Sequence, residues 1–371
     1  MALSSSSDRL KLKLFKGRKI FRPFFCSMLF FPFGLYAQNG LNFSFESFSY
    51  SEPTSIYSIS GKWNESIGKG DRALSVSKAK LGFEIDHYHL ALVSRYDIHY
   101  QFRNETAELI YLTENQKELA VGQSYPLLID AFKSSSYGVE FGLVLPLAPS
   151  WTIKPSISLL KPSALQVGVL QGQADIVGPK DYDFKFISDL IYDEDPLYER
   201  EPEGIAGEGY SVDFAIQYES KKWRLEVQLL DAIGELYFPS AQHTRANASS
   251  DTKRFDENGY VIYDPSIIGK EGYKSYTYQF HHQLHADWRY QLNPENQLSI
   301  QHHDYGSIDF QQLAWIRDYQ NIRVSYQWVP VMETAGLSLL TESFSLDLMV
   351  DNLDYQEMKF FQMNFQFNYE F

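Results

Sequence analysis

The chain has 371 residues, a formal net charge of −14 and a single cysteine. This acidic balance excludes a protein that binds nucleic acid through clustered phosphate contacts, and one cysteine excludes a disulfide framework. Aromatic residues make up 16% of the chain, with 26 Tyr and 27 Phe. The length suits two ordinary domains or one large β-barrel, whose strands place only every second residue in lipid and so keep the mean hydropathy low.

The N-terminal segment predicts export. Seven basic side chains lie between residues 8 and 22, an apolar run covers residues 23–35, and Tyr36-Ala37-Gln38 follows. A basic region, a short apolar region and a small residue before a polar start are the parts of a secretory signal peptide. We therefore expect a signal peptide over residues 1–37. Its removal leaves a net charge of about −20. A retained anchor helix is the alternative, disfavoured by the short run and by Pro32.

The C-terminal segment shows the clearest strand pattern. Its apolar side chains are Phe361, Met363, Phe365, Phe367, Tyr369 and Phe371, and they alternate with Gln362, Asn364, Gln366, Asn368 and Glu370. Strict alternation is typical of a β-strand with two different faces. A soluble sandwich would usually fill its inner face with Val, Ile and Leu. An aromatic face opposite an amide face instead favours a strand between lipid and a wet lumen.

The same alternation recurs along the chain. Clear segments are 207–218, 276–290 and 320–329, and weaker ones lie near 89–102, 136–146, 151–160, 163–172, 182–193 and 221–231. Some 14 to 17 candidate strands result, where a spanning strand needs about 9–11 residues. We expect an all-β fold: residues 38–371 form one antiparallel, up-and-down transmembrane β-barrel of about 14–16 strands.

The connections alternate in length. Short turns are expected near 147–150, 219–221, 291–295 and 318–320, and long loops over 103–134, 194–206 and 232–272. Such barrels have short periplasmic turns and long external loops. The C-terminus falls on the short-turn side only if residues 341–343 form a turn. An even strand number then requires that residues 38–52 lie outside the wall, or a miscount elsewhere. Residues 104–118 predict a short helix, either on the surface of a loop or capping or plugging the pore.

The C-terminus also resembles a known assembly signal. The final Phe371 shares its face with Tyr369 and Phe367. This pattern resembles the terminal signal that the barrel assembly machinery of Gram-negative bacteria reads. The resemblance implies a location in the outer membrane, with the assembly machinery, outer-membrane lipids and lipopolysaccharide as partners. No nucleic-acid partner is expected, and the long loops offer a surface for a protein partner.

A looser resemblance covers residues 135–235. Its parts are Gly207-Glu208-Gly209-Tyr210-Ser211-Val212-Asp213, the strand from Trp223, and Leu230-Asp231-Ala232-Ile233-Gly234. A glycine-rich strand with an Asp, followed by a strand that ends in an Asp-x-x-Gly corner, is similar to FadL-like and TraF-like uncharacterised outer-membrane barrels. The resemblance implies a barrel of that type.

Histidines form the one candidate binding cluster. His281 and His285 face the predicted lumen, and the next strand carries His303, with Asp287 nearby. With residue 285 opposite 303, the imidazoles would lie about 5 Å apart at Cβ. This cluster is a candidate for transition-metal binding or a charge change near pH 6.5. The alternative is an ordinary set of wet-lumen residues, because one residue of register slip removes the geometry. We predict no bound metal and no cofactor.

These patterns favour a channel or transport-type barrel of unknown substrate. The alternative from another class is a non-conducting barrel that serves as a scaffold or accessory of a secretion, pilus or surface-assembly system. An outer-membrane enzyme is the third alternative. The sequence has no Gly-x-Ser-x-Gly or His-Glu-x-x-His string. Asp86, His87 and His89 beside a predicted tight turn are the one candidate rim pair for catalysis, and an exposed turn is the simpler interpretation. We therefore expect no enzymatic activity.

Overall fold

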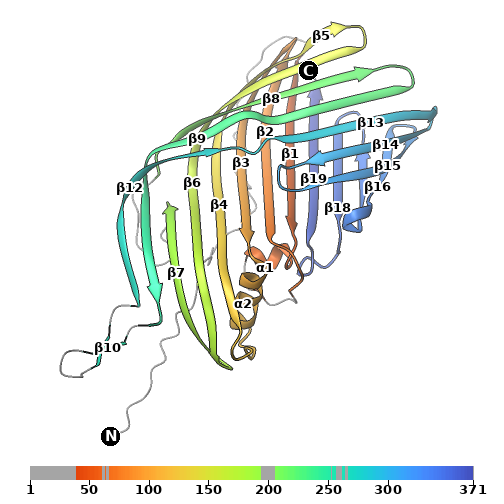
Figure 1. Cartoon of the computed structure of the whole chain (residues 1–371). Coiled ribbons are helices and arrows are strands. Elements are labelled where there is room, and N and C mark those ends of the chain that lie inside the picture. The colour runs from red at the N-terminus through yellow and green to blue at the C-terminus, as the bar shows by residue number, and fades with distance from the viewer. Residues whose placement is uncertain are drawn as a thin grey trace.

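The computed structural model describes residues 39–60, 63, 67–193, 205–251, 253–255, 261–263 and 266–370. The predicted signal peptide and Phe371 lie outside these residues, as does most of the predicted loop 194–206. Figure 1 shows long antiparallel strands that curl into a barrel, with a few short helices at one end. The predicted all-β, antiparallel barrel with a short helical insertion is confirmed.

The strands are β1 Asn39–Ser51, β2 Arg72–Ile85, β3 Tyr88–Phe102, β4 Ser124–Leu143, β5 Leu145–Ala148, β6 Trp151–Gly178, β7 Asp181–Tyr192, β8 Glu208–Glu219, β9 Trp223–Ser249, β10 Lys253–Phe255, β11 Val261–Tyr263, β12 Ile267–Gln279, β13 Gln283–Asn293, β14 Asn296–Asp304, β15 Asp309–Tyr319, β16 Ile322–Val329, β17 Thr334–Leu340, β18 Phe344–Val350 and β19 Phe360–Glu370. The helices are α1 Ile56–Ser60, α2 Asn104–Glu114 and the 3₁₀ turn η1 Pro330–Met332.

Seventeen strands form one sheet, and β10 and β11 form a separate two-stranded ribbon. Three pairs of strands share a single position in the wall. β5 follows β4 beside β6, β7 and β8 lie end to end between β6 and β9, and β12 and β13 lie end to end beside β9. This leaves 14 wall positions, within the predicted range.

The first and last strands close the barrel. β1 pairs with β19 on one edge, from Gly40 opposite Glu370 to Tyr50 opposite Phe360, and with β2 on its other edge. Of the two alternatives that the sequence left open, residues 38–52 outside the wall is therefore wrong, and the other, a miscount elsewhere, is correct. The count failed because two interrupted strands each looked like two spanning strands. The turn expected at residues 341–343 is present between β17 and β18.

The two rims of the barrel differ. One end, the short-turn rim, carries the tight connections β2–β3, β8–β9, β13–β14, β15–β16 and β17–β18, together with the start of β1 and the end of β19. The other end, the loop rim, carries α1, α2, the β10–β11 ribbon and η1 (Figure 1). Most connections thus alternate between short and long, as the sequence pattern indicated, and the tight β6–β7 turn between Gly178 and Asp181 at the loop rim departs from it.

The loops are shorter than their predicted bounds because the strands on one side are very long. β9 runs through residues 232–249 of the expected loop 232–272, and β4 begins at Ser124 within the expected loop 103–134. Segment 242–248 has no large apolar side chain and thus resembles a loop. It is nevertheless hydrogen-bonded to β7 on one side and to β12 on the other. Pairing along both edges satisfies its backbone without large apolar side chains.

Helix α2 lies against the outward face of the wall. Its Ala107 and Leu109 pack with Tyr125 and Ile129 of β4. These β4 residues share a face with Phe141, which is 45% exposed near the short-turn rim. Thr106 also accepts the backbone N–H of Leu128 and so occupies part of the β4 edge that β3 leaves free. The helix therefore covers the outside of the barrel, as the surface interpretation held, and does not plug the pore.

The outward face has the character of a lipid-facing surface. Large apolar side chains point outward all round the wall, including Leu92 at 62% exposure and Leu337 at 55%. Near the short-turn rim the rings of Trp223 and Trp288 stack with their centroids 4.9 Å apart. Apolar bands bordered by aromatic girdles are typical of membrane-spanning barrels.

Candidate functional site: the barrel lumen

The loop-rim half of the interior is packed with apolar side chains. On the β4–β6–β9–β12 side, Phe132 and Tyr278 stack with centroids 3.5 Å apart, and Phe238 and Leu236 are fully buried beside them. On the opposite side, Phe48 stacks on Tyr305 at 4.0 Å, within a second buried cluster that includes Phe310 and Phe360. Together these two apolar clusters fill the lumen above its polar half.

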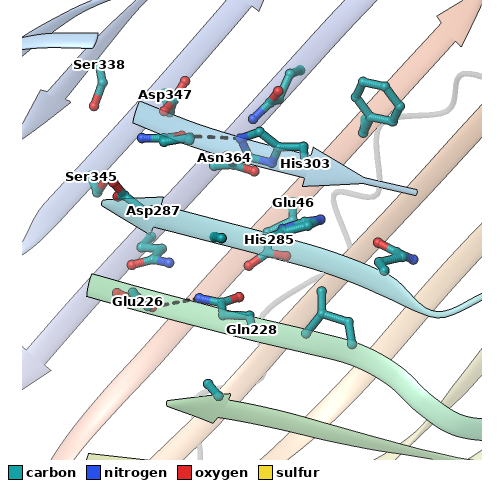
Figure 2. Close-up of a pocket in the computed structure, with 18 of the residues that line it drawn as sticks. Glu46, Glu226, Gln228, His285, Asp287, His303, Ser338, Ser345, Asp347 and Asn364 are labelled. Atoms are coloured by element: carbon teal, nitrogen blue, oxygen red, sulfur yellow. Dashed lines mark hydrogen bonds between the residues drawn. The ribbon is translucent and has the colours of Figure 1, made fainter. Parts of the chain in front are cut away.

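The short-turn half of the lumen contains a polar cavity of about 590 Å³. Figure 2 shows its walls: β9, β13 and β14 carry Glu226, Gln228, His285, Asp287 and His303 on one side, and Glu46, Asn364 and Asp347 lie on strands behind them. The alternation of each strand explains this wall, since every second residue faces inward. The cavity is therefore lined mainly by charged and amide side chains.

A buried network of charges lies between the polar cavity and the apolar clusters. The Arg95 guanidinium contacts Asp97 at 2.6 Å and also Asp231, and the Lys78 ammonium contacts Asp213 at 3.1 Å. The side chains of Arg95, Asp97 and Asp231 are all at most 3% exposed. Each charge is therefore compensated by a hydrogen-bonded partner, as burial requires.

A β-bulge brings two of these acids together. The register of β8 against β9 shifts between Val212 and Phe214, so that Asp213 and Asp231 meet at the irregularity. Asp231 has a positive φ of 52°, and its backbone N–H donates to Asp213 Oδ1 at 2.8 Å. A bulge redirects a side chain in this way. The bulge turns the Asp231 carboxylate toward Arg95 on the facing wall.

Further ion pairs line the mouth of the cavity. Arg224 lies directly opposite Arg289 on neighbouring strands, and Glu226 lies opposite Asp287. Arg224 contacts Glu226 at 3.3 Å and Arg289 contacts Asp287 at 2.5 Å, so each arginine has an acid two residues along its own strand. Near the same rim, Lys80 pairs with the buried Glu140. The acids Glu226 and Asp287 offset the repulsion between the adjacent Arg224 and Arg289.

The predicted histidine cluster is divided in the structure. His285 lies directly opposite His303, with ring centroids 5.0 Å apart. His281 is elsewhere: its ring stacks on His99 at 5.0 Å, beside Tyr278. Asp287 accepts hydrogen bonds from Arg289 and Ser299.

In the part of the chain that the structure describes, no group of three or more His, Cys, Asp or Glu side chains is placed to hold a metal ion. The described residues also contain no helix that is long and apolar enough to cross a membrane.

The remaining predicted positions lie at the rims. Phe367 and Tyr369 are on the outward face of β19, 39% and 54% exposed, while Phe371 lies outside the described residues. Asp86 occupies the tight β2–β3 turn with a φ of 53°. His89 leaves this turn toward the interior, with Nε2 3.5 Å from Glu140.

Sequence reasoning missed the centre of the lumen. Asp213 and Asp231 were noted only as parts of a family-like pattern, and their partners Lys78 and Arg95 were not singled out. The available signal was a charged residue on the inward face of an otherwise apolar strand: Arg95 follows Ala91 and Val93, and Asp97 comes next. Such buried charges require partners, but the sequence does not say which ones.

The similarities to known proteins that follow are all at low sequence identity. No protein-family model and no curated protein matches the chain. Among solved structures, the toluene transporter TodX of P. putida is 7% identical, with a TM-score of 0.42 over 90% of this chain and 89% of that one.

Two further solved structures are similar. The monoaromatic hydrocarbon channel CymD is 8% identical, with a TM-score of 0.43 over 91% of this chain and 89% of its own. The Ralstonia pickettii toluene transporter TbuX is 7% identical, with a TM-score of 0.31 over 91% and 90%. The fold itself rests on the strand pairing, which closes the sheet into a β-barrel.

Proposed function

We propose that this chain is a transport-type barrel of the outer membrane that admits small polar solutes into its lumen. The polar cavity of about 590 Å³ inside a closed barrel is the observation that carries this proposal. The apolar outward face, the aromatic residues at the rim and the predicted signal peptide support an outer-membrane location. The substrate class follows from the charged and amide lining of the cavity.

The packed half of the lumen means that the resting barrel is a poor pore. Phe132 and Tyr278 belong to an apolar cluster above the Arg95 network. A solute that crosses the barrel must displace these side chains. Planar-bilayer recordings of the purified protein test this, and small discrete conductance steps are expected.

A variant sharpens the bilayer test. Tyr278→Ala removes the ring that stacks on Phe132, and larger steps are expected from it. Tyr326→Ala is the matched control, because Tyr326 is 45% exposed on the outward face; its steps should equal those of the unmodified protein. Silent bilayers for all three proteins at high loading would refute the transport proposal.

A non-conducting scaffold is the second candidate, and the filled loop-rim half of the lumen is the observation that favours it. Such a barrel would support a secretion, pilus or surface-assembly system through its loops. Crosslinking in cells should then capture one specific large partner. Recovery of lipids and assembly machinery alone, together with conductance in bilayers, would exclude this function.

A further inference from the structure

The carboxylates of the polar cavity are unevenly partnered. On the β9–β13 wall each acid has an arginine: Glu226 pairs with Arg224 and Asp287 with Arg289. On the opposite wall, Glu46 has neither an ion-pair nor a hydrogen-bond partner among the residues that the structure describes. Lys78 of β2 lies directly opposite Glu46 in the sheet, but its ammonium contacts Asp213 at 3.1 Å. Glu46 therefore presents a carboxylate to the cavity without an ion-pair contact of its own.

Asp347 is the second carboxylate on this wall. Its Oδ2 accepts a hydrogen bond from Gln327 Nε2 at 2.8 Å, whereas its buried Oδ1 has no partner. No cation among the described residues contacts it; Arg289, held by Asp287 on the facing wall, acts on it only at longer range. A buried carboxylate oxygen with no donor is costly unless a ligand or water supplies one.

The two carboxylates lie at the same level of the wall. Asn364 on β19 is directly opposite Glu46 of β1 on one side and directly opposite Asp347 of β18 on the other. Glu46 and Asp347 are thus separated by two strand spacings, roughly 9.6 Å along the wall. Both also act electrostatically on the Tyr305 hydroxyl, which lines the same cavity. Glu46 and Asp347 therefore belong to one candidate binding site.

Two buried amide side chains add hydrogen-bond acceptors to this candidate binding site. Gln327 and Gln362 are 6% and 2% exposed, line the cavity, and each has a carbonyl oxygen with no hydrogen-bond partner. Gln362 lies two residues before Asn364 on the same face of β19, and is therefore diagonally across from Asp347 on β18. Phe48 and Tyr305 form a stacked aromatic surface next to them. Acceptor oxygens beside aromatic rings are suited to an organic ammonium group.

From this arrangement we propose that the wall formed by Glu46, Asp347, Gln327 and Gln362 binds a linear aliphatic diamine. One ammonium group is held by Asp347 and the two glutamine carbonyls, the other by Glu46, and the short alkyl chain spans the intervening strand beneath Tyr305. The inference deepens the proposed function and rests on it, since the diamine is then the class of solute that the barrel admits.

Calorimetric titration of 1,4-diaminobutane into the full-length mature barrel in detergent tests the proposal. Saturable binding is expected. Asp347→Asn and Glu46→Gln should each weaken it by about tenfold or more, because each removes a charge-assisted contact to an ammonium group. n-Butylamine, which has one ammonium group, should bind more weakly than the diamine to the unmodified protein.

Controls separate a local site from general negative charge. Glu219→Gln removes an exposed acid at the short-turn rim that does not line the cavity, and its affinity should stay within about twofold of the unmodified protein. Folding of every variant is checked by the shift of its band between unheated and boiled gel samples. Equal binding by Glu46→Gln, Asp347→Asn and the unmodified protein, or no saturable binding, would overturn the proposal.

The titration is independent of conductance. Saturable binding to a barrel that is silent in bilayers supports the diamine site and refutes the transport proposal. Conductance steps from a barrel that shows no diamine binding refute the site and leave the transport proposal in place.

Discussion

The buried network at the centre of the lumen predicts a large loss of stability on removing its arginine. Arg95 donates three hydrogen bonds to carboxylates, two to Asp97 and one to Asp231. Its guanidinium also lies 3.8 Å from the centre of the Phe280 ring. Arg95→Met keeps much of the aliphatic volume but leaves the buried carboxylates of Asp97 and Asp231 without their arginine partner.

The expected magnitude follows from burial. Removing one partner of a fully buried ion pair costs about 3–5 kcal/mol, because the remaining charge stays desolvated. The side chains of Arg95 and Asp97 are 3% and 2% exposed, so no discount for solvent screening applies. Arg224→Met is the matched control: Arg224 is 38% exposed and pairs with Glu226 at 3.3 Å. Its loss should cost less than about 1 kcal/mol.

Urea unfolding in lipid vesicles, followed by tryptophan fluorescence, measures both variants. A further variant with Arg95→Met, Asp97→Asn and Asp231→Asn should regain part of the lost stability, because the acids are then neutral and Asn tolerates the positive φ at residue 231. If Arg95→Met stays within about 1 kcal/mol of the unmodified protein, the reasoning about buried charge at this site is refuted.

Three other predictions concern assembly and the wall. Phe371→Asp should reduce the amount of assembled barrel in outer-membrane fractions, and normal assembly would show that the terminus is not a signal. Gly138→Ala should impair folding, because a Cβ there would lie 1.9 Å from the Leu159 carbonyl oxygen, while Gly272→Ala, with nothing within 4 Å, should fold normally on a cold gel. Leu92→Arg should cost up to about 2–4 kcal/mol in urea unfolding, because it places a charge in lipid; an unchanged midpoint would mean that this face is not lipid-exposed.

The fold class was predictable because alternate residues of a barrel strand face lipid and lumen, and therefore alternate in polarity. The C-terminal strand shows this directly: the outward Phe365 and Phe367 alternate with the inward Asn364 and Gln366, and the structure pairs β19 in that register with β1 and β18. The alternation of short and long connections placed the two rims by the same logic.

The boundaries of the strands were harder to predict from the sequence. β6 is one strand of 28 residues, although its sequence suggested separate segments near 151–160 and 163–172. A local fault in alternation has the same appearance whether the chain turns or only shifts register. In β6 the fault is a bulge opposite Ser135 and Ser136. Which of the two occurs depends on the hydrogen bonds that neighbouring strands supply, and these are not local in the sequence.

Single residues of the lumen show which features the sequence determined and which depended on the tertiary structure. The sequence by itself determined that His285, His303 and Asp287 face inward, because inward orientation follows from the period of the strand. Only the tertiary structure decided that Arg95 meets Asp231, 136 residues away in the chain, and that Glu46 and Asp347 lie level with each other on either side of Asn364. Barrel closure sets which strands face each other across the lumen. The β-bulge beside Asp213 sets the position of the Asp231 carboxylate along the barrel axis. Both are consequences of long-range pairing, which no local pattern encodes.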